Sequence, residues 1–425
     1  MSDQQNLPEN YLYHQLPNGI ELIGQYMQSL NSITMGFQLD AAVINEPEEK
    51  QGLAHLFEYM LFQGTKTKDA RALNEAFDSL GVRKGASTGW ETSRIMAQMV
   101  NTKFDATLPL LHEILLTPTF PRDDLEQMRN IVLQEIRRRD YEPMSRIFDL
   151  ARANFYRGTA LSRSSLGTTE TVQKLERKDL QSFWKERYQP NNILFAIAGK
   201  FDWEHVVEQV QALFGNWKGQ ATPSPEQKPT PTANIALEHQ EGKQEHLGLM
   251  FPFPSYNDPD YYAAMVISEV LGGNMASRLF VEVREKRGLV YSVSAGLAGN
   301  KSLGAMRVYA GTTPEQGHEC LEVVVNELRK LEQEGITTDE LDRAKVQLKS
   351  ENVMRGEGSG SRMAAISHSW WYERKLRTIQ EVKAAIDAVT EEQILQVLHR
   401  FSPLNPLTVA AIGPLEQDAL VGSIL

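Results

Sequence analysis

The chain has 425 residues, of which 41% are hydrophobic and 23% charged, as in an ordinary soluble globular protein. This length exceeds the size at which one core stops growing, so we expect at least two domains. The net charge of −11 argues against a nucleic-acid partner, which would need a basic surface. The single cysteine, Cys320, excludes an internal disulfide and a thiolate metal cluster.

The N-terminal sequence MSDQQNLPEN is polar and lacks the basic start and apolar run of a signal peptide. No apolar stretch approaches the roughly 20 residues that span a bilayer, so we expect no membrane partner. The sequence therefore predicts a cytoplasmic protein, or a periplasmic one if a leader has been removed.

Local patterns predict both strands and helices in each half of the chain. Ser32–Asp40 alternates as a strand does, and Ala305–Ala310 does the same in the second half. Gly52–Thr65, which reads GLAHLFEYMLFQGT, predicts a mostly apolar helix closed by Gly64. Asp69–Leu80 predicts an amphipathic helix.

A proline-rich linker divides the chain. Gly219–Asn234 reads GQATPSPEQKPTPTAN, with four prolines and almost nothing apolar, so we expect it to be extended and exposed. The predicted domains are therefore residues 1–218 and 235–425.

The two halves resemble each other. HEILLTPTFPRDDLEQMRNIVLQE and NELRKLEQEGITTDELDRAKVQLKSE both predict a helix, a break and a second helix, and Leu125 corresponds to Leu341, 216 residues later. RYQPNNILFAIAG and RFSPLNPLTVAAIG form a second pair, in which Pro190 and Pro403 are 213 residues apart. Two matches at nearly one offset indicate a tandem duplication. We expect an α+β fold of two similar domains, each a mostly antiparallel sheet with helices on one face, facing each other across a cavity.

The helix predicted at Gly52–Thr65 contains His55 and Glu58. In the inverted zinc motif H-x-x-E-H, two histidines four residues apart bind Zn²⁺ and the glutamate activates the metal-bound water. Here Tyr59 replaces the second histidine. A phenol has a reference pKa of about 10 and must lose its proton to bind zinc well, and no neighbouring His or Cys replaces it.

The sequence GLAHLFEYMLFQGT resembles the signature of the pitrilysin/insulinase family of zinc peptidases at nearly every position except Tyr59. The resemblance extends over roughly residues 10 to 415 and points to a bacterial branch similar to processing peptidases. It implies a third zinc ligand at Glu135, in IVLQEIRRR. It also implies a substrate-binding pair in the second domain, Arg284 and Tyr291, within SRLFVEVREKRGLVYSVSAG.

The resemblance implies that His55 and Glu135 are vestigial metal ligands and that Glu58 is a vestigial base. With two ligands left, we expect no cofactor in this chain, because a catalytic zinc needs three. We expect the Tyr59 hydroxyl to fill the site within hydrogen-bond reach of His55, Glu58 or Glu135.

A second departure lies on a predicted edge strand. The family usually has Asn-Ala-x-Thr there, where the backbone of a peptide substrate adds as another strand. This chain has Gly85 in place of the asparagine, although Ala86 and Thr88 remain. The first-domain half of the active site has therefore lost residues that the family usually has, whereas the second-domain half keeps Arg284 and Tyr291.

Each candidate also has a simpler interpretation. A lone histidine on an apolar helix, such as His55, is usually a core side chain, and Glu58 could be a buried acid bonded to a backbone amide. Glu135 and Arg284 could lie on solvated, salt-bridged helix faces.

The resemblance implies a zinc-less subunit of a heterodimeric metallopeptidase, which binds peptide and supplies Arg284 and Tyr291 to a partner's zinc site. That partner is a homologous subunit with an intact H-x-x-E-H motif. One alternative is an active zinc endopeptidase that uses His55, Glu135 and an unusual third ligand, against which Tyr59 argues. Another is a structural family member with no role in proteolysis, like the core subunits of some respiratory complexes, against which the retained Arg284 and Tyr291 argue.

Overall fold

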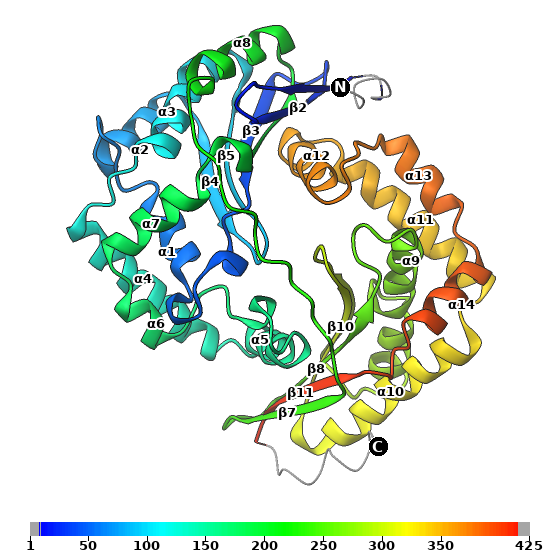
Figure 1. The fold of residues 1–425 in the computed structure, drawn as a ribbon. Coiled ribbons are helices and arrows are strands. Elements are labelled where there is room, and N and C mark those ends of the chain that lie inside the picture. The colour runs from blue at the N-terminus through cyan, green and yellow to red at the C-terminus, as the bar shows by residue number, and fades with distance from the viewer. Residues whose placement is uncertain (1–7, 9, 415–425) are drawn as a thin grey trace. The chain divides into compact units, whose positions relative to one another are not determined.

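Two separate sheets organise the computed structural model, which describes residues 8 and 10–414 (Figure 1). The first sheet has the strand order β1-β2-β6-β3-β5-β4. Among its described strands, the β2–β6 pair is parallel and the other pairs are antiparallel. The strands are β1 (Tyr11–Gln15), β2 (Glu21–Tyr26), β3 (Ser32–Leu39), β4 (Arg83–Thr88), β5 (Ser93–Val100) and β6 (Ile193–Gly199).

The second sheet has the order β7-β11-β8-β10-β9. It repeats the order β2-β6-β3-β5-β4 strand for strand, and its β7–β11 pair is parallel like β2–β6. This match confirms the predicted duplication and the mostly antiparallel character of each sheet. The strands are β7 (Asn234–His239), β8 (Glu245–Phe253), β9 (Ser292–Ala298), β10 (Gly304–Thr312) and β11 (Thr408–Gly413).

The helices follow the same repeat. Helices α4 and α11 begin 216 residues apart, and so do α5 and α12. The first half contains α1 (Leu53–Met60), α2 (Ala70–Ser79), α3 (Phe104–Leu116), α4 (Arg122–Asp140), α5 (Pro143–Phe155), α6 (Thr169–Lys174), α7 (Arg177–Arg187) and α8 (Trp203–Phe214). The second half contains α9 (Tyr261–Gly272), the π-helix η7 (Phe280–Glu285), α10 (Gly317–Glu334), α11 (Thr338–Arg355), α12 (Ser359–Glu373), α13 (Ile379–Asp387) and α14 (Glu391–Arg400). No helix within the described residues is both long enough and apolar enough to cross a membrane.

One prediction about these helices is wrong. Helix α1 ends at Met60 and is not closed by Gly64. Gly64 instead has φ +150° and forms an isolated β-bridge with Asp69, the residue that caps α2. The glycine therefore serves the turn between the two helices.

The chain divides into two compact units that exchange one helix between the repeated halves. Unit 1 is drawn from segments 1–137, 164–225 and 354–378, and unit 2 from 138–163, 226–353 and 379–425. Helix α5 of the first half thus belongs to unit 2, where it packs against β7, β8 and β11. Helix α12 of the second half belongs to unit 1, where it packs against the equivalent strands β2, β3 and β6 (Figure 1). The predicted domain borders at residues 218 and 235 separate the two repeated halves. They do not account for the exchange of α5 and α12 between the units.

A glycine on the central strand of each sheet accommodates the exchanged helix. A Cβ added at Gly36 of β3 would lie 3.2 Å from Met363 of α12. A Cβ added at Gly248 of β8 would lie 2.8 Å from Ile147 of α5. The opposite face of each sheet packs against the other helices of its unit and forms the main apolar core.

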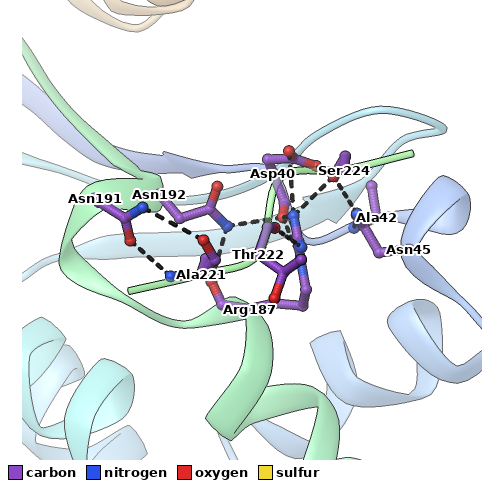
Figure 2. Close-up of polar contacts among 9 residues, drawn as sticks. All are labelled: Asp40, Ala42, Asn45, Arg187, Asn191, Asn192, Ala221, Thr222 and Ser224. Carbon is purple, nitrogen blue, oxygen red and sulfur yellow. Dashed lines mark hydrogen bonds and ion pairs between the residues drawn. The ribbon is translucent and has the colours of Figure 1, made fainter. Parts of the chain in front are cut away.

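Most of the linker Gly219–Asn234 is exposed, as predicted, but Ala221 and Gln227 are buried. Arg187, at the end of α7, is 3% exposed. Its guanidinium donates hydrogen bonds to the backbone oxygens of Asp40 (2.9 and 2.6 Å) and Thr222 (2.6 Å) and to Ser224 Oγ (2.8 Å), as Figure 2 shows. The Thr222 carbonyl belongs to no β-ladder, so the buried arginine satisfies it.

Two further contacts hold the linker. The Asn191 amide oxygen accepts from Ala221 N (2.8 Å), and Ala221 is buried (Figure 2). In unit 2, Gln227 is buried and its Oε1 accepts from Ala160 N (2.9 Å). The linker is therefore anchored on both sides of the border between Pro225 and Glu226.

We expect Arg187→Lys to lower the free energy of unfolding by about 2 kcal/mol, because one ammonium cannot replace a fork of charged hydrogen bonds. Urea unfolding would measure the loss. Limited proteolysis should also cut near Thr222 faster in the variant. Arg71→Lys, on an exposed i,i+4 pair with Glu75, is the matched control and should have little effect. Equal stability of both variants would show that the linker anchor is unimportant.

Candidate active site

Helix α1 has a fixed N-terminus. The buried Glu46 carboxylate accepts hydrogen bonds from the backbone nitrogens of Gly52 (3.1 Å) and Ala54 (2.7 Å). Gly52 has φ +87°, and a Cβ there would lie 2.5 Å from the Leu166 carbonyl oxygen. A carboxylate at a helix N-terminus and an obligatory glycine therefore set the direction of α1 and of the site residues on it.

Helices α1 and α4 bring three of the predicted residues into direct contact. His55 Nε2 lies 2.8 Å from Glu135 Oε2, and the Tyr59 hydroxyl donates to Glu135 Oε1 at 2.7 Å. The rings of His55 and Tyr59 meet edge to face, with centroids 5.3 Å apart. The predicted position of the Tyr59 hydroxyl is confirmed, and its partner is Glu135.

These residues do not fit a zinc ion. A tetrahedral zinc at its usual bond lengths holds two ligand atoms ~3.3 Å apart. His55 Nε2 and Glu135 Oε2 are 2.8 Å apart and bond to each other, while a neutral phenol occupies the other carboxylate oxygen. Among the described residues, no group of three or more His, Cys, Asp and Glu side chains is arranged to hold a metal.

The imidazole of His55 lies between two carboxylates. Burial alone would lower the pKa of His55, but the carboxylates of Glu58 and Glu135 outweigh burial and raise it above 6.5. His55 Nδ1 is 3.6 Å from Glu58 Oε2. The two carboxylates therefore favour the protonated form of this imidazole.

We expect this raised pKa to make stability depend on pH. A raised folded-state pKa gives stability that is complete below the unfolded value of about 6.5 and is lost as pH rises through the folded value. The difference in unfolding free energy between wild type and His55→Gln should therefore be larger at pH 6 than at pH 9. Urea unfolding across this range measures it. A difference independent of pH would mean that His55 is neutral in the folded protein.

Arg284 and Tyr291 are both open to solvent in unit 2. Arg284 lies in η7, is exposed, and its guanidinium stacks on the Phe280 ring at 5.0 Å from the centroid. Tyr291 precedes β9 and is 44% exposed. Its backbone nitrogen donates to the Gly311 carbonyl (3.1 Å), which ties the residue to β10.

Comparison with known proteins identifies the family of this fold and motif. Residues 26–169 match the family described as insulinase (peptidase family M16), and residues 174–348 match the peptidase M16 inactive domain. An uncharacterized zinc protease of Streptomyces coelicolor is 30% identical over 412 residues, which cover 95% of this chain and 89% of that protein. The chain belongs to peptidase family M16.

A second relative and two solved structures also match this chain over most of its length. An uncharacterized zinc protease of Bacillus subtilis is 28% identical, with 89% of this chain and 92% of that protein covered. The crystal structure of a peptidase M16 inactive domain from Pseudomonas fluorescens has a TM-score of 0.90 at 22% identity and covers 96% of this chain and 98% of its own. A protease from Helicobacter pylori has a TM-score of 0.88 at 21% identity, with coverage of 96% and 100%. The two structures show the same fold.

Glu58, at the motif position of the expected base, lies in a partly buried environment. Glu58 Oε2 is buried and has no hydrogen-bond partner among the described residues. It adjoins a small cavity whose lining includes Ser93, Arg94 and Tyr188 and which has room for about one water molecule. A peptide group is too large for this cavity.

The edge strand expected in an M16 active site is present. Among the described strands, β4 pairs with β5 alone, so its other edge is unpaired. A Cβ added at Gly85 would meet nothing within 4 Å. Packing against the described residues therefore does not require a glycine at this position.

Sequence reasoning missed the residues that surround Tyr291. His246 Nδ1 lies 3.4 Å from the Tyr291 hydroxyl and 2.9 Å from the Tyr309 hydroxyl. The alternation of EHLGLMFPF places His246 on the sheet face opposite Leu247 and Leu249, which was the available signal. His55, Glu58, Tyr59 and Glu135 thus belong to one cluster in unit 1, while Arg284 and Tyr291 belong to unit 2.

Proposed function

We propose that this M16 protein is the zinc-less subunit of a heterodimeric metallopeptidase. It binds peptide and supplies Arg284 and Tyr291 to the zinc site of a homologous subunit with an intact H-x-x-E-H motif. The proposal rests on one contrast. The metal ligands of unit 1 are bonded to each other and to Tyr59, whereas the donors of unit 2 are exposed.

The exposed pair suits transition-state binding. A guanidinium has a permanent charge and a phenol has one hydroxyl proton, and both donate to a peptide carbonyl or to the oxyanion that forms when a hydroxide attacks it. Arg284 forms no ion pair with a carboxylate among the described residues, so its charge remains available. The free edge of β4 offers main-chain hydrogen bonds to an extended peptide, which supports a role in holding substrate.

Reconstitution tests the proposal. The chain would be mixed with each M16 protein of the same organism that has an intact motif, and complex formation followed by size-exclusion chromatography. Cleavage of a quenched fluorescent peptide library would be measured for each protein and for the mixture. We expect no cleavage by this chain alone and cleavage by one mixture.

The alternatives give different outcomes. Cleavage by this chain alone, abolished by Glu58→Gln, would establish an active peptidase with an unusual metal site. A stable complex in which this chain adds nothing to cleavage would establish a structural role.

A further inference from the structure

The Tyr291 hydroxyl belongs to a cluster with two buried residues. His246, at the start of β8, is 5% exposed and Tyr309 of β10 is 2% exposed, against 44% for Tyr291. The Tyr309 hydroxyl lies 2.9 Å from His246 Nδ1, and the Tyr291 hydroxyl lies 3.4 Å from the same imidazole nitrogen. One buried imidazole nitrogen is therefore within hydrogen-bond reach of a buried phenol and of an exposed phenol.

A glycine makes room for this cluster. Gly311 of β10 lies opposite His246 of β8 in the sheet. A Cβ at Gly311 would lie 2.5 Å from the Tyr291 hydroxyl oxygen and 2.8 Å from that of Tyr309. Any larger residue would separate the two hydroxyls, so the glycine is part of the arrangement.

Burial favours the neutral forms of His246 and Tyr309, because it lowers the pKa of His246 and raises the pKa of Tyr309. A neutral imidazole has its proton on one of its two nitrogens, and this choice sets the direction of every hydrogen bond in the cluster.

The two tautomers of His246 differ in where the Tyr291 hydroxyl can donate its proton. If Nδ1 has no proton, it accepts a hydrogen bond from Tyr309 and also draws the Tyr291 proton inward. If Nδ1 has the proton, His246 donates to the Tyr309 oxygen, and Nδ1 can accept nothing from Tyr291. The Tyr291 proton is then free to point outward.

We propose that His246, in its Nδ1–H form, and Tyr309 are positioning residues that make Tyr291 an outward hydrogen-bond donor. This inference rests on the proposed function, because a donor to a peptide carbonyl must keep its proton available. Both side chains act through Tyr291 and contact no substrate themselves. His246 and Tyr309 come from neighbouring strands of one sheet, so the position of the hydroxyl is fixed by the fold.

The tautomer of His246 can be measured in this chain alone, without the proposed partner subunit. The full chain would be labelled with ¹⁵N-histidine, and the His246 resonances assigned among the nine histidines by their loss in His246→Gln. We expect the one-bond proton coupling at Nδ1 and the acceptor-type shift at Nε2. An unprotonated Nδ1 would overturn the proposal, whatever the activity of the complex.

The positioning role is tested in the reconstituted pair by a double-mutant cycle. We expect Tyr309→Phe to lower kcat about tenfold with little change in KM, the effect of one lost ordering hydrogen bond. In a chain that already has Tyr291→Phe, adding Tyr309→Phe should not lower kcat further. Full additivity of the two substitutions would overturn the proposal, because a merely structural defect acts independently of the Tyr291 hydroxyl.

A glycine pair gives a matched control. Gly311→Ala places a methyl group against both hydroxyls and should lower kcat like Tyr309→Phe. Gly296→Ala, on the adjacent strand β9, adds a methyl group that meets nothing within 4 Å and should leave kcat unchanged. Equal kcat for both variants would contradict the role of the cluster. If no mixture cleaves peptides, the proposed function fails, while the tautomer measurement still decides the hydrogen-bond direction.

Discussion

Tyr59→His is expected to bind one zinc ion per chain, where the wild type binds none. The substitution restores two histidines at i and i+4 on α1, and Glu135 already points at both positions. It also removes the phenol that occupies Glu135 Oε1. Loss of an outer contact to a zinc ligand already costs about 10- to 100-fold in affinity, so gain of a ligand should exceed about 100-fold. Elemental analysis after dialysis and calorimetric titration would measure it.

Tyr59→Phe is the matched control for this experiment. It removes the hydroxyl bond to Glu135 but supplies no ligand, so we expect no stoichiometric zinc. Adding Glu135→Gln to Tyr59→His should abolish binding again. If Tyr59→His folds normally and binds no zinc, α1 and α4 do not retain the geometry of a zinc site, and Tyr59 is not the decisive change.

Tyr291→Phe should lower peptide turnover by the reconstituted pair about 10²- to 10³-fold, the loss expected for one oxyanion donor. The ring stays in place, so assembly and the fold should survive, as size-exclusion chromatography and thermal unfolding can check. Turnover at saturating peptide should fall more than the apparent affinity, because the hydroxyl acts chiefly in the transition state.

Glu58→Gln in this chain should change turnover by the pair very little. The base that acts in the complex belongs to the partner, and Glu58 adjoins a cavity the size of one water molecule. The opposite order, with Glu58→Gln inactive and Tyr291→Phe normal, would place a working site inside this chain. Normal activity of both variants would support a structural role.

The repeated segments and the strand patterns were sufficient to predict the two sheets. Ser32–Asp40 and Ala305–Ala310 correspond to β3 and β10, and Asp69–Leu80 to α2 with its two caps. The exchange of α5 and α12 could not be predicted, because an amphipathic pattern shows that a helix is buried on one side but not which sheet it covers. The burial of Ala221 within the linker could not be predicted, because the residues that anchor this part of the chain, Arg187 and Asn191, lie outside it.

The candidate site, like the fold, could be predicted from the sequence only in part. Tyr59 and Glu135 were placed together because a family motif specifies both positions. The raised pKa of His55 depends on the summed effect of burial and two carboxylates, which no motif encodes. His246 and Tyr309 meet through strand register, 63 residues apart in sequence, and neither belongs to a recognisable pattern.

The exchanged helices also constrain how the protein is made. The last helix of the first half, α8, ends at Phe214, but α12, which covers the second face of the same sheet, ends at Glu373. Ribosomes add about 5–20 residues per second, so the interval lasts roughly 10 to 30 seconds. During it, apolar strand residues such as Ile23, Leu194 and Ala196 lack the helix that buries them. The nascent first half is then a candidate for chaperone binding until translation is nearly complete.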